Sequence, residues 1–154
     1  MNNKEKLNHS DIILSDCIVD GIEVNGHNIL LKMNRTGIII KEEKTSKYFR
    51  TKHAQVTFEE CDIDNISIQL TNIICYLGKY EVAIIHNIKY DDFVQNISMG
   101  KWRFEIVEEF YSHLGGKFTG KLRMKKKSYW CNLNLCFENI AYFWNEIDYR
   151  YEVK

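Results

Sequence analysis

Proline is absent from the 154 residues, so no segment is barred from a central strand on that ground. Long apolar runs are also missing. A membrane-spanning helix needs about 20 consecutive apolar residues, whereas Ile38–Ile40 and Val82–Ile85 are among the longest runs here. The polar N-terminus has no apolar stretch typical of a signal peptide. We therefore expect a cytoplasmic protein that does not bind membranes.

Neither sign of charge is in excess, because 21 Lys and Arg balance 21 Asp and Glu. No overall field steers the chain to nucleic acid or anionic lipid, so nucleic acid is a disfavoured partner. The cysteines are odd in number and show no CxxC spacing: Cys17, Cys61, Cys75, Cys131 and Cys136. Without closely spaced Cys or His pairs we predict no zinc site and no cofactor, but free, mostly buried thiols.

What the chain does have is sustained alternation of apolar and polar residues between Lys101 and Phe137, the pattern of half-buried strands. It predicts antiparallel strands at Trp102–Tyr111, Phe118–Met124 and Tyr129–Phe137, joined at Gly115-Gly116 and by Lys125–Ser128. In the first strand, strict alternation places Glu105 and Glu109 on one face. It places Phe110 on the opposite, apolar face, which Glu108 interrupts.

Shorter apolar segments predict more strands: Asp11–Val19, His27–Met33, Gly37–Lys41, Gln55–Glu59, Ile66–Thr71 and Tyr80–His86. Asp20-Gly21 and Asn25-Gly26 favour tight turns. We expect Ile73–Leu77 to continue the strand Ile66–Thr71 after a bulge. Tyr80–His86 is mostly apolar, which is typical of a central strand.

One helix is predicted where Tyr90, Phe93, Val94 and Ile97 follow helical spacing, capped by Asp91 or Asp92 and ended by Gly100. The charged segment 42–53 predicts a long loop or an exposed helical turn. Glu138–Tyr151 fits either a helix or a strand, and its aromatic density favours a strand.

These elements predict a disordered segment, 1–10, followed by a single β-rich domain, 11–154. The expected fold is mainly β: an antiparallel β-sandwich or partly open barrel with one short helix at about 91–99. The alternative is an α+β fold with a C-terminal helix.

The candidate binding residues are a basic hairpin with an exposed aromatic ring and two aromatics in the charged segment: Lys121, Arg123, Lys125, Lys126, Lys127, Trp130, Tyr48 and Phe49. Cations beside aromatic rings suit an acidic protein partner, and less well nucleic acid. The structural alternatives are a solvated edge hairpin and rings that fold back on the sheet. Exposed aromatics of this region would also suit a homodimer.

Other chemistry has weaker signals. A hydrolase would use Glu105, Glu109 and His113, because two carboxylates on one face can share acid and base roles. Cys131 or Cys136 with a nearby histidine would serve as a nucleophile only as a thiolate. A barrel lined by large apolar side chains would carry a small molecule. Each of these residues also has a purely structural explanation. The glutamates can form cross-strand ion pairs, and the cysteines can pack in the core.

The opening residues Leu14-Ser15-Asp16-Cys17-Ile18, then Ile22, Asn28–Leu31 and Gly37, resemble small β-rich bacterial proteins of unknown function. Some of those are similar to immunity proteins encoded beside polymorphic toxins. The resemblance covers the first quarter of the chain and implies a non-catalytic, binding role in the bacterial cytoplasm, with a toxin as partner. The expected function is therefore a cytoplasmic protein that acts through protein–protein contact.

Overall fold

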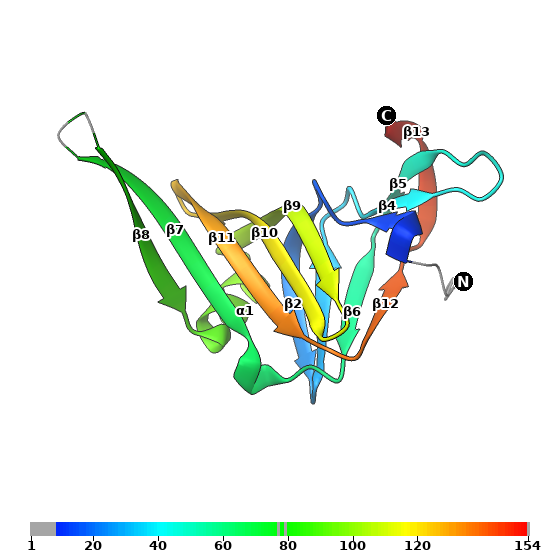
Figure 1. Ribbon diagram of the computed structural model, residues 1–154. Helices are drawn as coiled ribbons and strands as arrows, with labels where there is room; N and C mark the ends of the chain where they lie inside the picture. The colour runs from blue at the N-terminus through cyan, green and yellow to red at the C-terminus, as the bar shows by residue number, and fades with distance from the viewer. Residues whose placement is uncertain (1–8, 77, 79, 154) are drawn as a thin grey trace.

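The computed structural model describes residues 9–76, 78 and 80–153, which form two antiparallel β-sheets and one α-helix (Figure 1). The predicted mainly β class, a sandwich with one short helix, is confirmed. The alternative with a C-terminal helix is wrong, because that region forms two strands. Residues 1–8 of the segment predicted to be disordered lie outside the described residues, and His9–Asp11 is the 3-10 helix η1.

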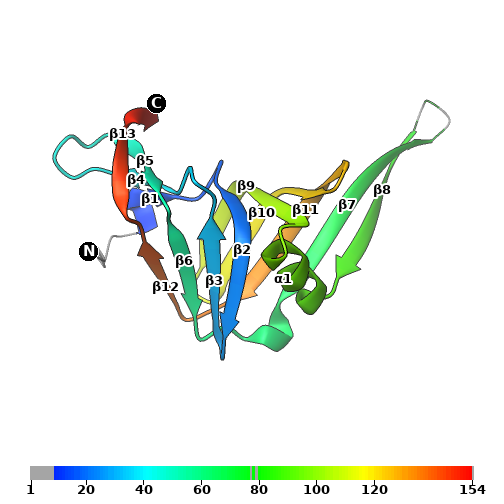
Figure 2. The same cartoon turned by 180° about the vertical axis from the view of Figure 1, so that it is seen from behind.

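The larger sheet has nine strands in the order β12-β6-β3-β2-β9-β10-β11-β7-β8. Their bounds are β2 (Ile18–Asn25), β3 (Asn28–Met33), β6 (Gln55–Glu59), β7 (Ser67–Tyr76), β8 (Tyr80–Ile88), β9 (Trp102–Ser112), β10 (Gly115–Met124), β11 (Lys127–Cys136) and β12 (Asn139–Phe143). The sheet curls so that one half, from β12 to β2, faces the other half, from β9 to β8 (Figures 1 and 2).

The core lies between these two halves. Phe58 of β6 and Phe118 of β10 are fully buried, with ring centroids 5.3 Å apart, and Phe137 lies 4.8 Å from Phe58. On β11 the alternation that the sequence predicted is confirmed, since Cys131, Leu133 and Leu135 are all buried. We call the side of the strands that meets this core the core face, and the opposite side of β9, β10, β11, β7 and β8 the outer face.

A smaller sheet of four strands closes one end of the molecule (Figure 1). It has the order β1-β4-β5-β13, with β1 at Ile12–Ile13, β4 at Ile39–Lys41, β5 at Tyr48–Lys52 and β13 at Glu146–Val153. The segment 42–53 is therefore not a long loop, because its second half is β5 and pairs with β13. A short 3-10 helix, η2 (Ile63–Asn65), precedes β7.

Two predicted features near the N-terminus are wrong, and the chain crosses in this region from the small sheet to the large one. Asp11–Val19 is not a single strand, because a turn with Asp16 at φ 63° separates β1 from β2. Asp20-Gly21 makes no hairpin but lies within β2, where the register against β3 shifts. The predicted turn at Asn25-Gly26 is confirmed, and it joins β2 to β3.

The helix α1 (Tyr90–Ser98) packs against β2 and β9, as Figure 2 shows. Phe93 and Ile97 are buried, and the Phe93 ring meets Phe104 of β9 with centroids 6.1 Å apart. Lys89 occupies the N-cap position, so Asp91 and Asp92 are first-turn residues rather than caps. Among the described residues no helix has the length and apolar character needed to cross a bilayer.

A bulge in β9 changes which side chains share a face. Gly120 of β10 pairs with Ile106, whereas the preceding Thr119 pairs with Glu108, so Val107 is left between them. The extra residue exchanges the two sides of β9 beyond that point. Phe110, predicted on the apolar face, is therefore on the outer face and 55% exposed.

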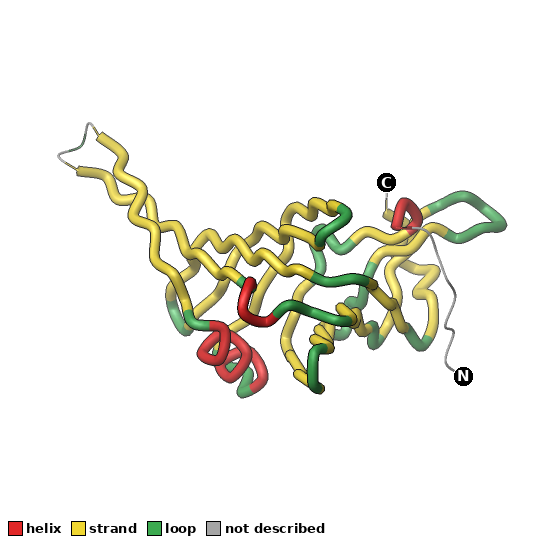
Figure 3. The backbone as a smooth tube through the Cα atoms, turned by 60° about the horizontal axis from the view of Figure 1, so that its bottom comes forward, coloured by secondary structure: helices red, strands yellow, loops and turns green. Residues whose placement is uncertain are grey.

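The apolar strand β8 is at the edge of the sheet, not in its centre as predicted. Its hairpin with β7 projects beyond the rest of the molecule (Figures 1 and 3). Pairing of β7 with β11 ends at Thr71, whereas pairing with β8 continues to Tyr76 without a register shift. The bulge expected before Ile73 is therefore absent from the described part of β7, and Leu77 lies outside the described residues.

Candidate binding surface on the outer face

The basic hairpin of the sequence prediction is β10 and β11, and its register places most of its candidate residues on the outer face. Lys121 lies between Glu105 of β9 and Trp130 of β11. Arg123, two residues further along β10, lies directly opposite Arg103 of β9. Alternation turns the intervening Leu122 into the core, where it is fully buried, and leaves the cations exposed.

We define the basic face as these exposed outer-face residues with the two turn residues that join β10 to β11: Arg103, Lys117, Lys121, Arg123, Lys125, Lys126 and Trp130. The candidate Lys127 is exposed, but it is the first residue of β11 and its register places it on the same side as Cys131, which is the core side. Two carboxylates share this face. Glu105 accepts a hydrogen bond from Arg123 at 3.0 Å between Nη2 and Oε2, and Glu108 lies opposite Thr119. Cations therefore outnumber carboxylates on this surface, although the whole chain is neutral.

The pairing of Arg103 with Arg123 across neighbouring strands is the least expected feature of the basic face. Like charges directly opposite one another on neighbouring strands destabilise a sheet. Both side chains are exposed, and the carboxylate of Glu105 pairs with only one of them. Since this arrangement does not serve stability, it suits the binding of a negatively charged group.

Around the cations the outer face offers polar and aromatic contact area. Trp130 is 39% exposed. Thr119 donates to Asn132 Oδ1 at 3.1 Å, and Asn134 donates to Ser67 Oγ at 2.9 Å, so these polar side chains are held in place by one another. An ordered surface with an exposed indole is typical of a protein interface.

Tyr48 and Phe49, the other two predicted anchors, do not join the basic face. Both belong to β5 in the small sheet. Phe49 is 6% exposed and its ring packs edge-on against Tyr149, with centroids 5.3 Å apart. This position matches the structural alternative, in which the ring folds back on the sheet, while Tyr48 is half-buried.

The carboxylate pair of the hydrolase hypothesis is divided by the bulge in β9. Glu105 is on the outer face, whereas Glu109 is on the core face opposite Phe118. Glu109 accepts hydrogen bonds from the Leu14 backbone N–H and from the Tyr111 hydroxyl, both at 2.7 Å. The expectation that Glu105 and Glu109 share a face is therefore wrong, and Glu109 anchors the N-terminal segment to β9. His113 lies in the turn after β9.

Three buried thiols are unsuited to nucleophilic chemistry. Burial raises the pKa of Cys131 to about 12, that of Cys17 to about 12 and that of Cys61 to about 11. Only the thiolate is a nucleophile, so these groups stay unreactive at neutral pH. The prediction of free, mostly buried thiols is confirmed for the four cysteines described, of which Cys136 is half-buried.

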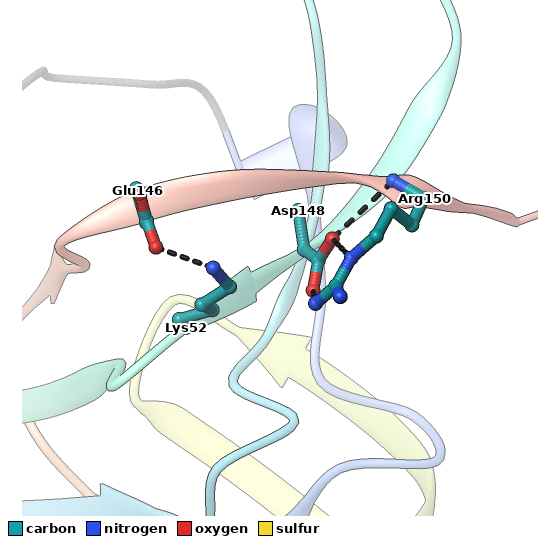
Figure 4. Close-up of polar contacts among 4 residues, drawn as sticks. All are labelled: Lys52, Glu146, Asp148 and Arg150. Carbon is teal, nitrogen blue, oxygen red and sulfur yellow. Dashed lines mark hydrogen bonds and ion pairs between the residues drawn. The ribbon is translucent and has the colours of Figure 1, made fainter.

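A second charged region, which the sequence interpretation missed, is a cleft of about 560 Å³ lined by the paired strands β5 and β13 and by Arg35 and Thr36. Figure 4 shows its two ion pairs, Lys52 with Glu146 and Arg150 with Asp148. Arg150 donates to both carboxylate oxygens of Asp148, at 2.8 and 2.7 Å, and so lowers the pKa of Asp148 to about 2. The alternating charged residues of β13 were the feature of the sequence from which this region could have been found.

Most cations of this cleft are engaged within the chain. Besides the two ion pairs, Arg50 donates from Nη2 to the backbone carbonyl of Asp16 at 3.2 Å, although its Nη1 is buried without a hydrogen-bond partner. The cleft is therefore better explained as a junction between the two sheets than as a binding site. Within the residues that the structure describes, no group of three or more His, Cys, Asp or Glu side chains is arranged to hold a metal ion.

The chain matches no protein-family model, no curated protein and no solved structure with which it was compared, so the basic face is defined by the sequence and the geometry of this chain.

Proposed function

We propose that this chain is a non-catalytic binding protein whose basic face docks an acidic protein partner. The observation that carries the proposal is the direct opposition of Arg103 and Arg123 beside Lys121 and Trp130. An acidic patch would relieve the repulsion between the two guanidinium groups, and the indole would supply apolar contact area at the centre of the interface.

A partner bound in this way would dissociate as salt is added, because exposed charge pairs are screened. Copurification from the native host at low salt tests the proposal, followed by a titration with the protein recovered. We expect an acidic protein to be retained by the wild-type chain. We expect the double variant Arg103→Glu, Lys121→Glu to lose it.

The matched control is Arg35→Glu with Lys44→Glu, which makes the same change of charge at two exposed positions outside the basic face. It should retain the partner. Arg103→Glu alone should also stabilise the free chain by about 0.2–1 kcal/mol, since it replaces a like-charge pair by an opposite one. Loss of binding with a gain of stability would separate a recognition role from a structural one.

The same copurification also detects bound nucleic acid. Recovery of RNA or DNA in place of protein would contradict the proposal. So would turnover of a substrate from a hydrolase panel by a chain that binds no protein.

The proposal extends to an immunity-like role in the bacterial cytoplasm, with a toxin as the acidic partner. The resemblance of Leu14–Ile18 and the segment up to Gly37 supports this extension. A neighbouring gene for a secreted nuclease or protease toxin would favour it. Co-expression with that toxin should then rescue growth, and the double variant at Arg103 and Lys121 should fail to do so.

A further inference from the structure

We infer that the free edge of β8 is closed by β8 of a second copy of this chain, so that two nine-stranded sheets join into one. This inference goes beyond the proposed function and does not depend on it, because β8 contributes no residue to the basic face. It rests on the exposure of β8, on how the other sheet edges are protected, and on the match of β8 with itself.

The hairpin of β7 and β8 exposes large apolar side chains on both of its faces. On the outer face Ile73 is 64% exposed and Ile85 62%. On the core face Ile74, Val82 and Ile84 are 40%, 48% and 37% exposed. In β8 every residue from Glu81 to Asn87 is exposed. Beyond Thr71 the hairpin has no third strand, because pairing of β7 with β11 ends there. A two-stranded ribbon is marginally stable in water, so this part of the hairpin lacks a neighbour.

The other terminal strands of the two sheets are protected in ways that β8 is not. Strand β1 has only 2 residues and β12 only 5. Strand β13 is longer, but it carries Glu146, Asp148, Arg150 and Glu152 and has a register shift. Short length, charge and bulges are the usual protections of an edge. Strand β8 has 9 residues, one carboxylate at Glu81, and regular pairing with β7.

A second copy fits this edge because β8 is complementary to itself. A two-fold axis normal to the sheet would pair β8 with its copy in antiparallel fashion and keep each face continuous. With the axis at Ile84, Ala83 lies opposite Ile85 of the second copy. Val82 then lies opposite its His86, and Glu81 opposite its Asn87.

Neighbouring registers fit less well. An axis at Ala83 would set Glu81 opposite Ile85 of the second copy, and an axis at Ile85 would set Ala83 opposite its Asn87. The register at Ile84 also brings Ile73, Ala83 and the second copy's Ile85 into one row of the outer face. Two neutral chains approach without net repulsion.

Sedimentation equilibrium of the full chain tests the inference, with a mass of two chains as the expected result. Ile84→Lys should yield a monomer with unchanged circular dichroism, because it sets two lysines against one another at the axis. The matched control is Phe110→Lys, which places the same charge at an exposed apolar position on β9. This variant should remain a dimer.

Disulfide cross-linking keeps the test decisive if Ile84→Lys fails to fold. Residues directly opposite across an antiparallel pair have Cβ atoms about 4.5–5.5 Å apart, within reach of a disulfide after a small adjustment. In a background with Cys75→Ser and Cys136→Ser, oxidised Ile84→Cys should form covalent dimers. Ile73→Cys, one strand inward, should not.

Three results would overturn the inference: a monomer at the highest soluble concentration, a dimer that Ile84→Lys leaves intact, or a dimer that only Phe110→Lys dissociates. The last would assign dimerisation to the outer face. Charge reversal at Arg103 and Lys121 should leave the mass unchanged, so failure of the proposed function and failure of this inference are distinguishable.

Discussion

Gly120 is required where β10 passes the bulge in β9. A Cβ at this position would lie 1.9 Å from the carbonyl oxygen of Glu105 and 2.9 Å from its carbonyl carbon. Both are backbone atoms, so no change of rotamer makes room. We expect Gly120→Ala to destabilise the protein by about 1–3 kcal/mol, the usual cost of overpacking a well-packed site. Urea unfolding monitored by circular dichroism measures this difference.

Gly21→Ala in β2 is the control for the loss of a strand glycine. There the added Cβ would meet only the side chain of Lys32, at 3.3 Å. Its effect on unfolding should be clearly smaller. If both substitutions cost the same, the close approach at Gly120 would not be the reason for the glycine.

The same bulge shows how far single residues could be placed from the sequence. Alternation assigned Phe104 and Ile106 to the core, and both are buried. The assignment of Glu109 and Phe110 was wrong, because a one-residue insertion reverses every later side chain. The local signal was Glu108 within an apolar face. A bulge removes that conflict, since it turns Glu108 outward.

At the scale of elements, β13 contains an ion pair between Asp148 and Arg150 whose strength depends on pH. Arg150 lowers the pKa of Asp148 to about 2 in the folded protein, whereas the carboxyl of an unfolded chain titrates near about 3.9. Stability from this group is therefore complete above about pH 4 and is lost as the pH falls towards 2. We expect Asp148→Asn to remove this part of the acid-induced loss of thermal stability.

Arg150→Leu should have the same effect, because the donor that lowers the pKa of Asp148 is then absent. The double variant should lose no more than either single variant. Thermal unfolding between pH 5 and pH 2 measures all three chains. Additive effects would show that Asp148 and Arg150 contribute to β13 independently.

The strands of the large sheet differ in how well their location and their position in the sheet could be predicted from the sequence. The alternation of β11 is strict, and both its location and its buried face were predictable. The location of β8 was predicted but its position in the sheet was not. A run such as Val82–Ile85 is typical of burial on both faces, yet all four residues are exposed here. The apolar pattern indicates a strand whose side chains are buried when it is paired on both edges. The second neighbour can be a strand of another copy of the chain.

At the scale of the whole molecule, the mainly β fold class could be predicted from the sequence. The way in which the strands pair into one curled sheet could not. Local periodicity reports that a segment is a strand, but pairs such as β2 with β9 join segments far apart in the chain. The basic face shows the same division. Most of its cations are close together in the sequence, on β10 and the turn after it. Arg103, which lies opposite Arg123, is on β9 and was not among the candidate residues.

Closure of the curled sheet depends on a few aromatic rings, and this leads to a prediction about cooperativity. Phe58 belongs to one half of the sheet and contacts Phe118 of the other half and Phe137. We expect Phe58→Ala to lower the free energy of unfolding by about 3–5 kcal/mol, as for other buried phenylalanines. Phe58→Leu, which keeps most of the apolar volume, should cost less.

Two tryptophans allow the halves to be followed separately. Trp102 is in β9, and Trp144 directly follows β12 and is 5% exposed. Variants that retain one tryptophan each should unfold at the same urea concentration, because neither half keeps a buried core without the other. Phe58→Ala should lower both midpoints equally. If it lowered the Trp144 midpoint alone, the halves would be independent units, and the contact between Phe58 and Phe118 would not hold the sheet closed.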